Sequence, residues 1–238
     1  MFFRRRTFRA ALFFLIASLY CTCIRAQEVG YLDTTHSRIR QRQREPNSGT
    51  SGGIVAGYSD GRSPSNAPLT LSLATDGNRE LGLGETFEYQ VQIRNDSSQI
   101  IELPWDLSPA DIEPETIGAT YQYEMVAVYL QADLGQGRRI TIQSSVLLFG
   151  SPSIASTTVK LRPGEWLRVK AKGHLVSANP SDVWPSKAGR DNVRITLTAT
   201  LTLYSNTFST VSAGNSHEES RVAMGPIFSN AKTVQSHF

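Results

Sequence analysis

Four carboxylates follow a tryptophan near the middle of this 238-residue chain: Asp106, Asp111, Glu113 and Glu115. Carboxylates that converge on one point can bind a metal ion or act as a general acid and base. This segment lacks the glycine and the alternate-position rhythm of a calcium loop, and two prolines interrupt it. We therefore predict a solvated connection between two strands. A secreted hydrolase built on this acidic loop is the alternative.

Other catalytic and metal-binding patterns are missing from the sequence. The four histidines are His36, His174, His217 and His237, and none has the short spacing to another that metal sites use. The sequence contains no nucleophile elbow, phosphate loop or dinucleotide fingerprint. We therefore predict a protein that is not an enzyme and that needs neither a metal ion nor a cofactor.

Two tryptophans are the better candidates for binding. Trp105 and Trp184 lie in proline-containing connections, where an exposed indole could stack on a sugar or anchor a protein. Together with Asp106 and Asp111 they define a hypothetical carbohydrate-binding site. The competing interpretation is that each indole lies beneath its loop and closes the edge of the fold. Trp166 begins an apolar stretch, and we expect it in the core.

A stripe of basic residues is a second candidate surface. Arg168, Lys170 and Lys172 alternate with apolar residues, so they share one face of a predicted strand. This basic stripe could bind an anionic polymer. The alternative, which we favour, is that its charges protect an edge strand against aggregation.

The N-terminus has the features of an export signal. Arginines precede an uncharged run from Ala10 to Ile24, which is long for a signal core and short for a membrane helix. We predict that residues 1–26 form a signal peptide and that the protein is secreted, periplasmic or on the cell surface. An uncleaved membrane anchor is the alternative, and the choice between general and twin-arginine export stays open.

Removal of the signal changes the charge and the cysteine content. Five of the 24 basic residues and none of the 21 acidic ones lie in residues 1–26, which leaves 19 basic and 21 acidic residues and a net charge of −2. The basic character of the whole chain is therefore no argument for a nucleic-acid partner. Both cysteines, Cys21 and Cys23, leave as well, so the fold depends on its core without a disulfide.

Alternating apolar and polar residues dominate the chain from Leu69 onward. The longest alternation covers Val193 to Tyr204, and turn residues separate it from shorter runs of the same kind. We predict an antiparallel β-sandwich of about eight strands in residues 69–228. Residues 27–68, which are poor in large apolar side chains, are predicted to be a disordered linker, and residues 229–238 a tail.

Two short motifs resemble those of bacterial extracytoplasmic immunoglobulin-like modules. In the first, a Gly-Glu pair precedes a strand that ends at asparagine, and in the second a Leu-x-Pro-Gly-Glu turn precedes a later strand. The matching residues are Gly84, Glu85, Asn95, Leu161, Pro163, Gly164 and Glu165. The resemblance covers roughly residues 69–205 and implies an immunoglobulin-like sandwich that acts as a spacer, adhesion unit or binding domain.

These observations together predict a non-catalytic interaction or structural module at the cell envelope. Its partner is expected to be a protein or a polysaccharide, and it would contact the membrane only through an uncleaved signal. Self-association through an open strand edge is a further possibility.

Overall fold

The computed structural model describes residues 27–36, 67–75, 81–82, 85–108, 118–133, 139–176, 193–212 and 215–237. The signal peptide predicted for residues 1–26 and most of the linker predicted for residues 27–68 lie outside this description. The described residues form twelve strands and one short 3-10 helix, so the fold is all-β. The elements are β1 (Glu28–Asp33), β2 (Leu69–Thr75), β3 (Leu81–Gly82), β4 (Thr86–Asn95), β5 (Ile101–Pro104), β6 (Thr120–Asp133), β7 (Arg139–Gly150), η1 (Ala155–Thr157), β8 (Thr158–Leu161), β9 (Trp166–Val176), β10 (Val193–Ser212), β11 (Asn215–Phe228) and β12 (Lys232–His237).

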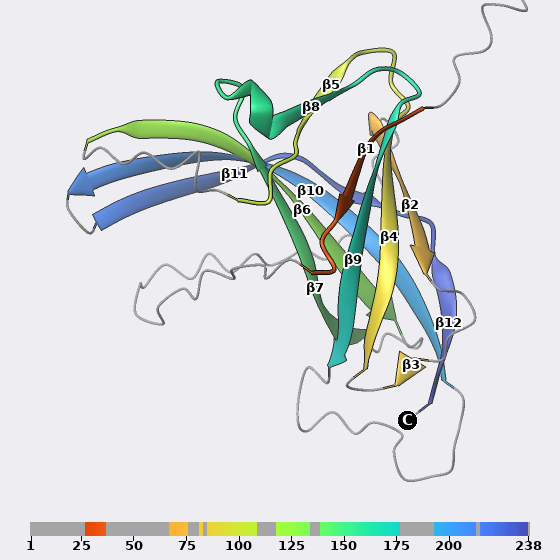
Figure 1. Ribbon diagram of the computed structural model, residues 1–238. Helices are drawn as coiled ribbons and strands as arrows, with labels where there is room; N and C mark the ends of the chain where they lie inside the picture. The colour runs from red at the N-terminus through yellow and green to blue at the C-terminus, as the bar shows by residue number, and fades with distance from the viewer. Residues whose placement is uncertain are drawn as a thin grey trace, which may run out of the picture.

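Ten strands form one large sheet in the order β2-β4-β9-β7-β6-β10-β12-β3, with β1 beside β9 and β11 beside β10. This sheet folds back on itself, so that β4 and β9 face β10 across the core in a sandwich-like arrangement (Figure 1). Strands β5 and β8 form a separate pair. The prediction of a mainly antiparallel all-β fold is confirmed, although β1–β9 and β12–β3 are parallel and the strands outnumber the predicted eight.

The main core is built from alternate residues of facing strands. Val91 of β4, Leu167 of β9, and Ile195, Leu197 and Leu201 of β10 are all 0% exposed. Full burial of such a side chain contributes about 1.5–3 kcal/mol, so these rows hold the two walls together. The predicted alternation after Val193 is therefore confirmed, with its apolar row facing the core.

Two strands correct the predicted linker and tail. Strand β1 lies at the start of the predicted linker (residues 27–68) and runs parallel to β9, with Tyr31 opposite Arg168. Strand β12 lies in the predicted tail (residues 229–238) and pairs with the first residues of β10. Both strands are short and have few large apolar side chains, so their own pattern is weak. They form because β9 and β10 offer unpaired backbone groups beside them.

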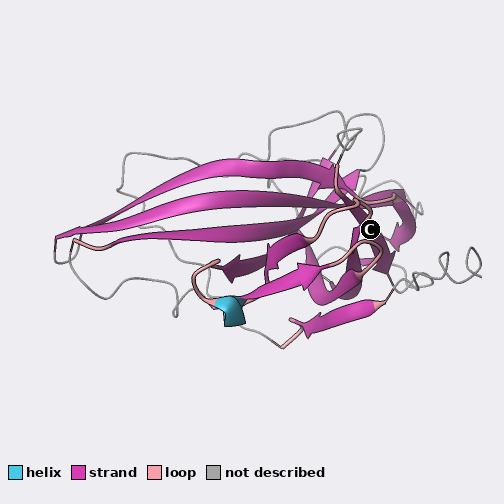
Figure 2. Cartoon of the chain, turned by 90° about the horizontal axis from the view of Figure 1, so that it is seen from above, coloured by secondary structure: helices cyan, strands magenta, loops and turns pink. Residues whose placement is uncertain are grey.

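Strands β6, β10 and β11 also extend well beyond the sandwich as a three-stranded projection (Figures 1 and 2). We call this projection the arm and define it as residues 120–125, 204–212 and 215–222. Within the arm β10 pairs with β6 on one side and with β11 on the other. The sequence alternation predicts a strand that ends at Tyr204, but β10 continues to Ser212.

The apolar face of the sheet changes sides where the arm begins. In the sandwich, Val126 and Val128 of β6 point into the main core. In the arm, Tyr123 and Met125 lie on the opposite face of the same strand and are buried with Phe208 in a second cluster. Side chains of β7 and of the segment before η1 pack against this cluster, namely Leu147, Phe149 and Ile154. The second cluster therefore attaches the base of the arm to the sandwich.

Candidate functional site

Asp106 helps to fix the backbone at the start of the acidic loop. Its amide nitrogen donates to the carbonyl oxygen of Phe149 at 2.9 Å, and its own carbonyl accepts from the amide of Phe149 at 2.6 Å. Its carboxylate accepts a hydrogen bond from the amide of Ser108 at 2.9 Å. Asp111 and the two glutamates after it lie outside the described residues. Within the described ranges, no group of three or more His, Cys, Asp or Glu side chains could hold a metal ion.

Trp105 packs against the main core, as the competing interpretation of this tryptophan predicts. Its side chain is only partly exposed, and its indole lies against Gly30 of β1. A Cβ atom at Gly30 would lie 3.3 Å from Cζ2 of Trp105 and 2.8 Å from Cδ2 of Leu167. Glycine at position 30 thus lets β1 close over the indole. Trp184, the other tryptophan of the hypothetical carbohydrate site, lies outside the described residues.

Asn95 joins the two motifs that resemble immunoglobulin-like modules. It is 0% exposed, and its amide nitrogen donates to the carbonyl oxygens of Gln99 and Leu161 at 2.7 and 2.9 Å. Its backbone accepts a hydrogen bond from Gly164 and donates one to Glu165, both in the Pro-Gly-Glu turn. Gly84 of the first motif lies outside the described residues. Asn95-Asp96-Ser97 matches a glycosylation sequon. The side-chain amide of Asn95 is buried and donates two hydrogen bonds, so it is not available for a glycan.

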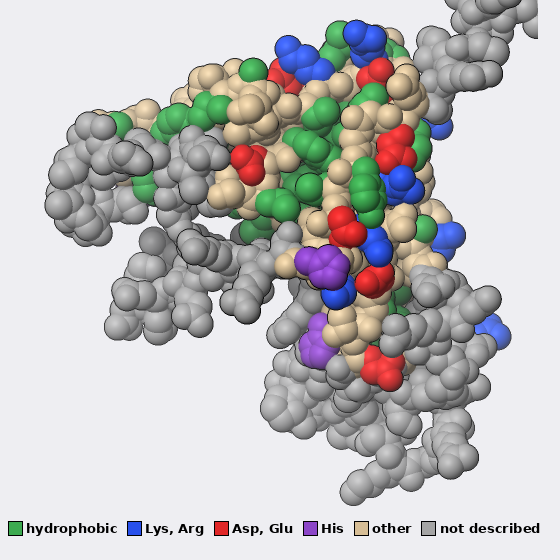
Figure 3. All heavy atoms as spheres, viewed as in Figure 1, with side chains coloured by type: hydrophobic (Ala, Val, Ile, Leu, Met, Phe, Trp, Pro, Cys, Tyr) green, Lys and Arg blue, Asp and Glu red, His purple; other side chains and the backbone are tan. Residues whose placement is uncertain are grey.

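The basic stripe lies on an interior strand, which corrects the prediction that it protects an edge. Strand β9 has β4 on one side and β1 and β7 on the other. Arg168 forms an ion pair with Glu28 at 2.9 Å, and Lys170 forms one with Glu88 at 2.7 Å. Lys172 also has an interaction partner. Acidic and basic side chains therefore alternate on this face instead of forming one basic patch (Figure 3).

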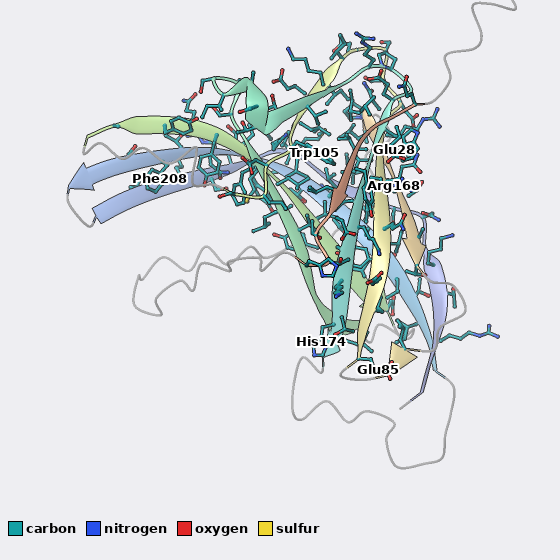
Figure 4. The ribbon with its side chains drawn as sticks, in the orientation of Figure 1. Glu28, Glu85, Trp105, Arg168, His174 and Phe208 are labelled. Carbon is teal, nitrogen blue, oxygen red and sulfur yellow. The ribbon has the colours of Figure 1, made fainter. Side chains whose placement is uncertain are left out.

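The ion pair between Lys170 and Glu88 stabilises the ionised form of both side chains. The hydrogen bond from Lys170 lowers the pKa of Glu88 below its ordinary value, and the same bond raises the pKa of Lys170. Arg168 also lies over the rings of Tyr31 and Trp166, at 4.9 and 5.8 Å from their centroids. Figure 4 shows Glu28 and Arg168 side by side on the outer face. The positive charge of the stripe is thus largely neutralised within the chain.

The row of even-numbered residues on β10, on the face away from the main core, carries buried polar groups. Thr200 is 4% exposed and Asn206 is 1% exposed, yet the hydroxyl of Thr200 and both amide atoms of Asn206 have no hydrogen-bond partner among the described residues. Burial also raises the pKa of the neighbouring Tyr129 to about 12, and Tyr204 adds to this effect. Unpaired buried polar groups cost stability, so this row weakens the fold where the arm begins.

The arm is the surface that the sequence interpretation missed. Strand β11 pairs with β10 along one side, and no other described strand pairs with its opposite side between Asn215 and Met224. The exposed side chains along this edge are His217, Glu219, Ser220, Arg221, Val222 and Ala223. The sequence does contain a pattern that indicates the arm. The large apolar residues change from odd to even positions between Leu203 and Phe208, as expected where the apolar face of a strand changes sides.

The fold and these surfaces define an all-β, sandwich-like protein with a projecting arm. No family model matches the chain, and no curated protein matches it. Among solved structures it is similar to Spo0M, the sporulation control protein from Bacillus subtilis, with 10% sequence identity and a TM-score of 0.28. The match covers 68% of this chain and 49% of that protein, so the chain spans about half of its length. A TM-score this low carries no argument about fold or function.

Among the described residues, no helix has the length and apolar character needed to cross a membrane.

Proposed function

We propose that this chain is an exported, non-catalytic interaction module of the cell envelope, built on an immunoglobulin-like sandwich and contacting its partner through the arm. The observation that carries the proposal is the outer edge of β11, where exposed residues lie along backbone that pairs with no other described strand. Open edges of this kind accept an added strand from a partner, which supplies main-chain hydrogen bonds.

The immunoglobulin-like assignment is supported by the contacts of Asn95. This residue ends β4 and binds the turn before β9, so the two motifs of the resemblance meet in space. Export is supported by the basic and then apolar N-terminal segment.

The carbohydrate and hydrolase hypotheses gain nothing from the described part of their candidate sites. The indole of Trp105 is used in packing, and the carboxylate of Asp106 is used in its own turn. The packing of the indole and the turn contact of the carboxylate therefore add no support to either hypothesis. Trp184 and Asp111 lie outside the described residues, and co-sedimentation with insoluble polysaccharide tests them directly.

Photo-crosslinking from the arm tests the proposed function. A photoreactive phenylalanine analogue replaces Val222, which is 61% exposed on the arm, in the full chain expressed by its host. The matched control carries the same group at Ile100, which is 62% exposed beyond the end of β4. We expect discrete adducts from position 222 that position 100 does not give. Identical adduct patterns from both positions, or no adduct from position 222, would contradict the proposal.

A further inference from the structure

The outer edge of β11, to which no strand of the described residues pairs, has a charge pattern that is complementary to itself. Glu219 and Arg221 lie two residues apart, so their side chains share one face of the strand. They form an ion pair at 2.7 Å, with 53% of the Glu219 side chain and 78% of the Arg221 side chain exposed. The hydrogen bond from Arg221 also lowers the pKa of Glu219. Both charges therefore remain within reach of a second molecule.

We propose that the partner at this edge is a second copy of the chain, whose β11 pairs antiparallel with the first through a two-fold axis at Ser220. In this register Ser220 lies opposite its own copy, and Glu219 of each chain lies opposite Arg221 of the other. The contact is isologous, so it closes at two copies. The proposal rests on the arm being the contact surface of the proposed function, and it names the occupant.

Neighbouring registers of the same pairing are disfavoured by charge. A shift of the axis to residue 219 places Glu219 opposite Glu219, and a shift to residue 221 places Arg221 opposite Arg221. Like charges directly opposite one another in an antiparallel pair are destabilising, whereas opposite charges stabilise it. A register that pairs odd-numbered residues of one β11 with even-numbered residues of the other would reverse one of the two arms. The charged face of one arm would then lie on the same side of the sheet as the face of the other arm that carries the second cluster. Of these neighbouring registers, the one centred on Ser220 satisfies both conditions.

The dimer would extend the sheet without changing either fold. Strands β6, β10 and β11 of the two copies form a continuous six-stranded sheet, and the exposed edge of each arm is removed. The exposed Val222 lies beside the axis, and part of its surface is covered by the second copy. Strand addition at an edge is the same interaction that holds β1 against β9 and β12 against β10 in this chain.

A cysteine at the axis gives a geometric test. The full chain carries Ser220→Cys in a background with Cys21→Ser and Cys23→Ser, and a mild oxidant is added. Directly opposite residues of an antiparallel pair have Cα atoms about 4.5–5.5 Å apart, which a disulfide spans. The matched control is Ala223→Cys, equally exposed, whose two copies would lie about 20 Å apart. We expect a covalent dimer from position 220 alone, and equal crosslinking at both positions would overturn the register.

Charge exchange gives the decisive test, read by light scattering after size-exclusion chromatography. We expect the wild-type chain to be dimeric, and Glu219→Arg and Arg221→Glu each to raise the dimer dissociation constant by about tenfold or more. The double exchange restores opposite charges, as does an equimolar mixture of the two single variants, so both are expected to dimerise. A monomeric wild type, or single variants that dimerise as well as the wild type, would overturn the proposal.

These outcomes separate this inference from the proposed function. If the wild type is monomeric but position 222 still gives its specific photo-adduct, the mass of the adduct identifies a different partner. In that case the arm remains the contact surface and the second copy is excluded. If position 222 gives no specific adduct in the host while the exchange series behaves as expected with the purified chain, the dimer forms in solution but not in the cell, and the envelope function loses its support.

Discussion

The side-chain amide of Asn95 donates a hydrogen bond of 2.9 Å to the carbonyl oxygen of Leu161, 66 residues farther along the chain. The same side chain accepts hydrogen bonds from the amide and the hydroxyl of Ser97. One buried residue therefore links the end of β4, the following turn and the end of β8. This explains why an asparagine terminates an otherwise regular apolar alternation.

Replacement of Asn95 by alanine is expected to lower the free energy of unfolding by about 3 kcal/mol. The substitution leaves the buried carbonyl group of Leu161 without this donor and removes the acceptor of the Ser97 amide and hydroxyl, and a buried group left without its partner costs about 1–3 kcal/mol. Urea unfolding followed by circular dichroism measures the loss. Ser98→Ala, at an exposed position of the same turn, is the control and is expected to change stability by less than about 0.5 kcal/mol. Equal effects of the two substitutions would show that Asn95 does not join these segments.

The sequence predicts the interior of this fold better than its edges. Strands β4, β9 and β10 can be predicted from the sequence because each buries one face. Burial of one face requires apolar and polar residues to alternate along most of the strand. Strands β1 and β12 are placed by backbone pairing to neighbours, and their side chains carry little of the burial that makes a pattern visible. The arm was missed because its apolar face reverses near Tyr204, which interrupts the period on which the prediction depends.

The candidate residues were found by type, but their roles depend on distant parts of the chain. Trp105 was identified as a binding residue or a packing residue, and only the position of Gly30 in β1 decides between these roles. The basic stripe on β9 was recognised, but its acidic partners Glu28 and Glu88 come from two other strands. No local pattern specifies such pairings, because they arise from the order of strands in the sheet.

Trp105 and Gly30 are expected to be energetically coupled. Trp105→Ala removes a partly buried indole and should cost about 2–4 kcal/mol. Gly30→Val forces a side chain into the indole and into Leu167, at a cost of about 1–3 kcal/mol. In the double variant the valine occupies space that the indole has left, so the combined loss should fall short of the sum by about 1 kcal/mol or more.

The control for this coupling is Gly173, which lies farther along β9 against the ring of Phe87. A Cβ atom there would lie 2.7 Å from Cζ of Phe87, so Gly173→Val also creates a clash. This clash does not involve Trp105, and the losses of Gly173→Val and Trp105→Ala should therefore add. Additive losses for the Gly30 pair as well would show that the indole does not rest on β1.

Two buried threonines should respond in opposite ways to the same substitution. Thr200→Val removes a hydroxyl that has no partner in the described part of the chain and keeps the shape of the side chain, so stability should rise by about 1 kcal/mol. Thr157→Val removes a hydroxyl that donates to Ile154 and accepts from the amide of Ser151, so stability should fall by about 1–3 kcal/mol. Thermal and urea unfolding of the two variants gives the comparison. A loss of stability in Thr200→Val would indicate that its hydroxyl is paired after all.

The pH dependence of stability should reveal Glu124 on β6. Burial, and then the charge of Glu102, raises the pKa of Glu124 above its ordinary value of 4.5. The folded state therefore holds this proton more tightly than the unfolded state does. Its contribution to stability is fully present below pH 4.5 and is lost as the pH rises through the folded-state pKa. Glu124→Gln, which cannot ionise, should gain stability relative to the wild type across this window.

Glu88 on β4 provides the control of opposite sign for this pH series. Its pKa is lowered by Lys170, so its contribution is present above the ordinary pKa of 4.5 and is lost as the pH falls through the lower, folded-state value. The stability of Glu88→Gln relative to the wild type should therefore decline as the pH rises, while that of Glu124→Gln increases. Unfolding free energies measured at intervals from pH 3 to pH 8 distinguish the two. If both differences move in the same direction, the desolvation of Glu124 is not what governs its ionisation, and the half-buried position assigned to it at the base of the arm is incorrect.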